Sequence, residues 1–129
     1  IGDLERVGDY AVNLTEYAEL LKNFNEKFTK DLLFEVEHLR ETIASLYQST
    51  MKAYMDKDFA ALDDVNKYED EVDDTVATIE KLHLQRLMDG IYPASVGQVY
   101  QEFASDTERI ADHFLNVAKS IRQLHVGED

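Results

Sequence analysis

The chain has 129 residues, 44% of them hydrophobic, no cysteine and a formal net charge of −14. This length and composition predict one folded domain, residues 1–129, and argue against a disordered chain. The charge would repel nucleic-acid phosphates and anionic lipids, so we expect no nucleic-acid binding. No apolar run approaches the roughly 20 residues needed to span a bilayer, so we expect no insertion of this chain into a membrane. Cations are its natural partners.

Apolar residues recur every three or four positions from residue 2 to about 27, which predicts a first long helix. The same spacing predicts helices over 31–56, 59–89 and 95–125, with Asp58 as N-cap of the third. Gly90, Pro93 and Gly97 mark the loop before the last helix. The sequence therefore predicts an all-α, up-down antiparallel bundle of four long helices.

Each of the last three helices has an apolar stripe that we expect to face the core. These stripes are Leu32, Val36, Leu39, Ile43, Leu46, Thr50 and Tyr54; Leu62, Val65, Val72, Val76, Ile79, His83 and Leu87; and Val99, Phe103, Ile110, Phe114, Val117 and Ile121.

A polar sequence motif near the start of the chain is repeated near its end. Residues 3–14 and 106–117 share the same acids, arginine and asparagine at the same spacing. The pairs are Asp3 with Asp106, Glu5 with Glu108, Arg6 with Arg109, Asp9 with Asp112, and Asn13 with Asn116. A fold requires apolar residues at such positions but not these polar identities, so the repeat indicates a duplicated site.

Residues four apart share a helix face, so Glu5 with Asp9 and Glu108 with Asp112 form two acidic stripes. Both stripes fall roughly opposite the apolar stripe of their helix and are expected to face solvent or a groove. A third pair, Glu69 and Asp73, lies on the flank of its apolar stripe.

Clustered carboxylates raise one another's pKa unless a cation neutralises them, so the three pairs predict a divalent metal site. Arg6 and Arg109 each reach an acid three residues away but cannot neutralise the whole set. The alternative is that the acids only solvate an acidic surface.

Two segments carry a resemblance to a known family. Residues 3–13, Asp-Leu-Glu-Arg-Val-Gly-Asp-Tyr-Ala-Val-Asn, resemble the signature of PhoU domains, the phosphate-uptake regulators. The later stretch is similar to the C-terminal PhoU-type domain of bacterial sodium/phosphate cotransporter homologues. Its matching residues are His83, Arg86, Leu87, Gly90, Gly97, the run from Thr107 to His113, and Asn116.

The resemblance implies the last helix of one three-helix PhoU repeat followed by a complete second repeat. It also implies multinuclear iron or zinc on the surface, held by the pairs Glu5 with Asp9, Glu69 with Asp73, and Glu108 with Asp112. Further candidate ligands are Asp3, Asp106 and His113.

The function implied by the resemblance is regulation of phosphate transport or phosphate signalling, without enzymatic activity. The expected partner is a phosphate transporter, the chain's own transmembrane domain or a sensor protein. We expect a cytoplasmic location with a tether to the inner membrane through a missing part of the chain. We also expect a homodimer that covers exposed apolar surface.

Two alternatives remain open, a carboxylate-ligated metal-dependent enzyme and a purely structural helical module. A buried di-iron site would need the pairs Glu35–His38 and Glu80–His83 to face inward together, and their helical phases argue against it. His83 is expected to be a hydrogen-bonded core residue, and His38 and His125 to be surface residues.

Overall fold

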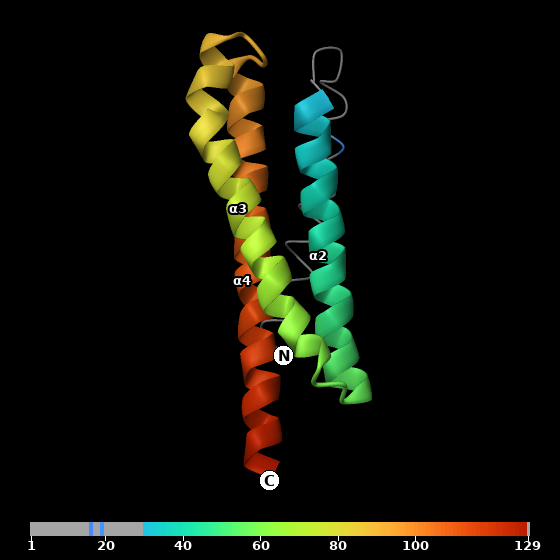
Figure 1. Cartoon of the computed structure of the whole chain (residues 1–129). Helices are drawn as coiled ribbons and strands as arrows, with labels where there is room; N and C mark the ends of the chain where they lie inside the picture. Colours follow the sequence, from blue (N-terminus) through green and yellow to red (C-terminus); the bar gives the residue numbers. More distant parts are fainter. Residues whose placement is uncertain (1–15, 17–18, 20–29, 129) are drawn as a thin grey trace.

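The computed structural model describes Glu16, Glu19 and residues 30–128, and the fold below concerns these residues. They form three helices, α2 (Lys30–Asp56), α3 (Ala61–Met88) and α4 (Ala94–Glu128), which run up and down beside one another (Figure 1). The all-α prediction is confirmed, and the predicted bounds of these helices are correct to within three residues. The predicted first helix lies, apart from Glu16 and Glu19, outside the described residues.

The turn from α2 to α3 is made by the backbone and not by the predicted cap. Lys57 takes the left-handed conformation, with φ of 56°, which ends α2. The N-cap of α3 is Ala60, whose side chain makes no capping hydrogen bond, so the prediction of Asp58 as the cap is wrong. The Asp58 carboxylate instead lies 3.4 Å from Lys52 Nζ, and its carbonyl oxygen accepts a hydrogen bond from the amide of Ala61.

Two glycines shape the loop from α3 to α4, one at the end of α3 and one in the first turn of α4. Gly90 has φ of 68°, a conformation that favours glycine and terminates α3. Gly97 is buried against Tyr92, where a Cβ atom would lie only 2.6 Å from Tyr92 Cε1. Tyr92 is itself buried and its hydroxyl lies 2.6 Å from His83 Nδ1, so the loop is packed onto the end of α3.

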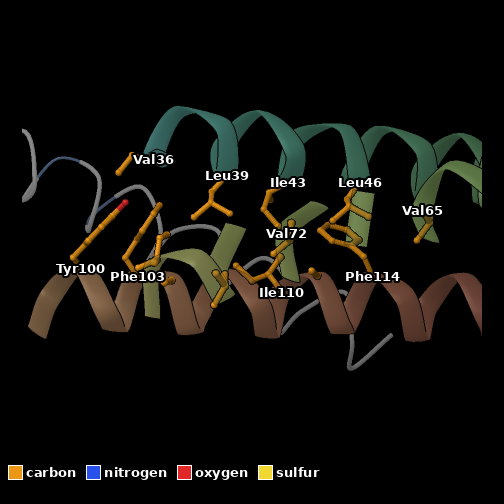
Figure 2. Close-up of a cluster of buried hydrophobic side chains, with 14 of the residues drawn as sticks. Val36, Leu39, Ile43, Leu46, Val65, Val72, Tyr100, Phe103, Ile110 and Phe114 are labelled. Atoms are coloured by element: carbon orange, nitrogen blue, oxygen red, sulfur yellow. The ribbon is translucent and has the colours of Figure 1, made fainter. Parts of the chain in front are cut away.

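One apolar core runs between the three helices. Figure 2 shows Ile43 of α2 and Ile110 of α4 pointing toward one another, with Val72 of α3 between them. The largest fully buried side chains include Tyr100, Phe103 and Phe114, all from α4. This broad apolar face of α4 lets it pack against both other helices at once.

The predicted core stripes are confirmed at most positions, with one clear error on α2. Tyr54 is 59% exposed, and Ala53 is buried in its place. The error arises because successive steps of four residues drift around an α-helix, which turns 100° per residue. None of the described helices has an apolar stretch long enough to span a bilayer.

Candidate metal centre

Acidic side chains from α3 and α4 meet on one flank of the bundle. Glu69 and Asp73 belong to α3, and Glu108 and Asp112 belong to α4, which runs beside α3 in the opposite direction. The negative charge of Asp112 acts on Glu69, and the charge of Asp73 acts on Glu108. Two of the three predicted pairs therefore form one acidic cluster, which we define as Glu69, Asp70, Asp73, Glu108 and Asp112.

The tightest part of the acidic cluster lies on α3. One carboxylate oxygen from each of Glu69, Asp70 and Asp73 lies within 4.8 Å of the others. Glu69 and Asp73 are half-buried, whereas Asp70 is exposed. Asp70 belongs to the acidic run that begins at Glu69, but the four-residue spacing rule passed over it because adjacent residues point in different directions on a helix.

Crowding and partial burial make Glu69 hard to ionise. Its pKa rises from 4.5 to about 7, first because burial disfavours the charged form and then because of a side-chain hydrogen bond with Asp73. The charges of Asp73, Asp112 and Asp70 add to this rise. At neutral pH, Glu69 therefore holds a proton for part of the time, in a position where a cation would serve the same purpose.

Glu108 of α4 is affected by the negative charges of the same cluster. Burial raises its pKa, and the charges of Asp73, Glu80 and Asp112 raise it further. We expected Glu108 to face away from the core, but it is half-buried on the flank toward α3. Asp112 is exposed, as expected.

The donor set suits a hard or borderline divalent ion. Oxygen–metal bonds are about 2.0–2.6 Å long, so two oxygens on opposite sides of one ion lie about 4–5 Å apart. The three oxygens on α3 already lie within 4.8 Å of one another. An ion bound there would remove the repulsion that raises the pKa of Glu69, which makes the cluster chemically fit for a metal.

Asp106 and His113, two other candidate ligands, lie on different sides of α4 from Glu108. The Asp106 carboxylate lies 3.5 Å from Arg109 Nη1, as the three-residue spacing predicts. Since Asp106 and Glu108 are two residues apart, their side chains point about 160° apart around α4. His113 is half-buried and lies about 140° around α4 from Glu108. Asp3, Glu5 and Asp9 lie outside the described residues.

A second polar group links all three helices and was not predicted. Arg86 on α3 donates two hydrogen bonds to Glu35 on α2, at 2.8 and 2.7 Å. The buried Tyr100 hydroxyl on α4 donates a third hydrogen bond to Glu35, at 2.6 Å. We call these residues the Glu35–Arg86–Tyr100 network.

The network shifts the pKa of both Arg86 and Tyr100 upward. The hydrogen bond to Glu35 raises the pKa of Arg86, although burial opposes this rise. Burial, followed by the hydrogen bond to Glu35, raises the pKa of Tyr100. Both carboxylate oxygens of Glu35 accept hydrogen bonds from Arg86. This pairing argues against a di-iron site built from Glu35 and His38.

The histidines only partly follow their predictions. His83 is half-buried and hydrogen-bonded to Tyr92, as expected for a core histidine. His38 is also half-buried and stacks on Phe34, with ring centroids 6.0 Å apart, so its prediction as a surface residue is wrong. The side chain of His125 lies outside what the structure describes.

Comparisons with known proteins agree with the resemblance. The PhoU domain family model matches residues 36–121. The phosphate-specific transport system accessory protein PhoU homolog 1 of Thermotoga maritima is 27% identical over 127 residues, which are 98% of this chain and 54% of that protein. The phosphate-specific transport system accessory protein PhoU homolog of Clostridium acetobutylicum is 27% identical over 130 residues, 99% of this chain and 57% of that protein. The chain spans about half the length of these curated relatives, and no solved structure matches it.

Proposed function

The chain belongs to the PhoU domain family, and on this premise we propose that it is a regulatory domain of phosphate transport or phosphate signalling. The observation that carries the proposal is the family match over residues 36–121, which extends from α2 through most of α4 and includes the whole acidic cluster. The matched relatives from Thermotoga maritima and Clostridium acetobutylicum are named as phosphate transport accessory proteins.

We propose that the domain acts by contact with a phosphate transporter or a phosphate-sensing protein on the cytoplasmic side of the membrane. The transporter is either a separate protein or a transmembrane part of the same polypeptide, as in sodium/phosphate cotransporter homologues. The likeness of the stretch that includes His83, Arg86 and Leu87 to the domain of those homologues supports the second arrangement.

The acidic cluster supplies the regulatory ligand site in this proposal. Glu69, Asp70, Asp73, Glu108 and Asp112 would bind iron or zinc, in one or more ions. The support is the crowding of the α3 carboxylates within 4.8 Å and the raised pKa values of Glu69 and Glu108. In this proposal the metal has a regulatory and not a catalytic role.

The regulatory role is tested by genetics on the full-length parent protein. Removal of the gene should change phosphate uptake or the response to phosphate starvation, and the full-length gene should restore both. Deletion of only residues 30–128 should behave like removal of the gene. If that deletion leaves phosphate uptake and the starvation response unchanged, this domain does not regulate them.

The metal site is tested by elemental analysis of purified protein after supplementation with iron and zinc. We expect stoichiometric metal in the natural protein and its loss in a Glu69→Gln/Asp73→Asn variant. The matched control is Glu37→Gln/Asp31→Asn on α2, which removes the same charge from exposed positions. Equal metal content in all three proteins, or no metal in any, would refute the site.

We also propose that the domain forms a homodimer. Its support is the large exposed apolar side chains at one end of the bundle, Tyr54 and Met55 of α2 and Leu124 of α4, each at least 59% exposed. Light scattering at high protein concentration should give twice the mass of one chain. A mass of one chain under those conditions would exclude the dimer.

A further inference from the structure

A cavity opens between α2 and α3, away from the acidic cluster. It has a volume of about 360 Å³ and is lined by Asp31, Phe34, Glu35 and His38 of α2 and by Thr75, Thr78, Leu82 and Arg86 of α3. In Figure 1, α2 and α3 diverge toward the end of the bundle that carries the α3–α4 loop, where these residues lie. Thr75 is about 200° around α3 from Asp73, so this groove and the acidic cluster lie on different sides of that helix.

The rim of this α2–α3 groove is apolar and exposed. Phe34 is 71% exposed, and its ring is parallel to the His38 ring, with an angle of 2° between the planes and 6.0 Å between the centroids. Leu82 on the facing helix is 36% exposed. An exposed aromatic platform opposite a leucine is an unfavourable arrangement in water and is relieved when an apolar side chain enters between them.

The polar groups of the groove favour a positively charged binding partner. Arg86 uses both of its terminal nitrogens on Glu35, so its charge is neutralised within the groove. Asp31 is exposed at the first turn of α2. The Thr75 and Thr78 hydroxyls donate to backbone carbonyls of their own helix, at 2.9 and 3.0 Å, which leaves them only as acceptors toward the groove.

The floor of the groove is preorganised. The Glu35–Arg86–Tyr100 network crosses from α2 through α3 to α4 and fixes the spacing of the two walls. A site with rigid walls loses little conformational entropy when it is filled. These hydrogen bonds therefore tie together the two helices that form the walls of the groove.

We propose that the α2–α3 groove is a docking site for a basic amphipathic segment of another protein. An apolar side chain of that segment would lie between Phe34 and Leu82, and a Lys or Arg one helical turn away would pair with Asp31. The inference rests on the groove alone and not on the proposed role in phosphate transport.

A second copy of this chain fits the groove poorly. The chain has 13 basic and 27 acidic residues, so a second copy would bring mostly like charge to Asp31. Anionic lipid would be repelled for the same reason. Charge complementarity thus selects a basic partner protein.

The experiment uses a fluorescent amphipathic helical peptide of leucine and lysine as the probe, with a leucine–glutamate peptide of the same pattern as its charge control. Binding to the whole chain is measured by fluorescence anisotropy. The groove variant is Asp31→Asn/Phe34→Ala. The matched variant, Leu84→Ala/Asp56→Asn, removes the same charge and an apolar side chain of 68% exposure from positions that do not line the groove.

We expect the lysine peptide to bind the natural chain and the groove variant to bind it about tenfold more weakly, with the matched variant unchanged. Added salt should weaken the binding. Equal losses in both variants would show general attraction to an acidic protein and would overturn the proposal, as would equal binding of the glutamate peptide.

Two further readouts keep the proposal testable. If the groove variant loses helicity by circular dichroism, Leu82→Glu on the opposite wall replaces it, with the same expected loss of peptide binding. If the groove variant instead lowers self-association in sedimentation, the occupant is a second copy and the proposal is wrong.

Discussion

Replacement of Glu69 by Gln is expected to change how stability depends on pH. The pKa of Glu69 is about 7 in the folded protein, against an ordinary value of 4.5. The folded state therefore binds the proton more tightly than the unfolded chain does. This contribution to stability is complete below about pH 4.5 and is lost as pH rises through about 7.

The size of this effect follows from the shift in pKa. A shift from 4.5 to about 7 corresponds to about 3.4 kcal/mol, since one pKa unit equals about 1.4 kcal/mol. Glu69 is only half-buried, so solvent screening lowers the realistic value to about 1–2 kcal/mol. Glutamine keeps the shape of the side chain and does not titrate. The variant should therefore not show the loss of stability that Glu69 causes as pH rises through about 7.

The assay is urea-induced unfolding at pH 5 and pH 8 with a metal chelator present. The difference in free energy of unfolding between the two pH values should be about 1–2 kcal/mol smaller in Glu69→Gln than in the natural protein. Glu41→Gln, at an exposed position of α2, controls for the loss of one charge. If both variants show the same pH dependence as each other, the folded cluster does not hold the proton as described.

The remaining predictions concern stability, measured as the free energy of unfolding in urea. Arg86→Met should cost about 2–4 kcal/mol, because Glu35 would keep its burial and lose both hydrogen bonds from arginine. Phe114→Ala should cost about 3–5 kcal/mol, because it opens a cavity among fully buried side chains. Gly97→Ala should cost about 1–3 kcal/mol, because its methyl group would meet Tyr92 at 2.6 Å.

Each of these three substitutions has a control variant or an outcome that would contradict its explanation. A Glu35→Met/Arg86→Met double variant should recover only part of the loss caused by Arg86→Met, since no unpaired charge remains but the buried Tyr100 hydroxyl loses its acceptor on Glu35. Gly97→Ala should be rescued in part by Tyr92→Ala, and a loss unaffected by that change would contradict the steric explanation. A change below about 1 kcal/mol in Phe114→Ala would contradict the close packing at that position.

The helices of this protein are determined locally and were accessible from the sequence. The spacing of Val36, Ile43, Val72 and Ile110 placed each of them in the core, because a 3.6-residue period leaves only one face to bury. The Glu69–Asp73 and Glu108–Asp112 pairs were likewise found from spacing within one helix. Their metal ligation stays a prediction.

What the sequence did not determine depends on how the helices are set against one another. The packing of α3 against α4 puts Asp112 near Glu69 and leaves Glu108 half-buried on the shared flank. Projection of the single helix had placed Glu108 toward solvent. The Glu35–Arg86–Tyr100 network joins residues 51 and 65 positions apart, and no local period encodes such a separation. The sequence by itself determined which face of each helix is apolar; the tertiary structure decided which polar flanks meet, because only the relative rotation and offset of packed helices bring distant side chains within hydrogen-bonding range.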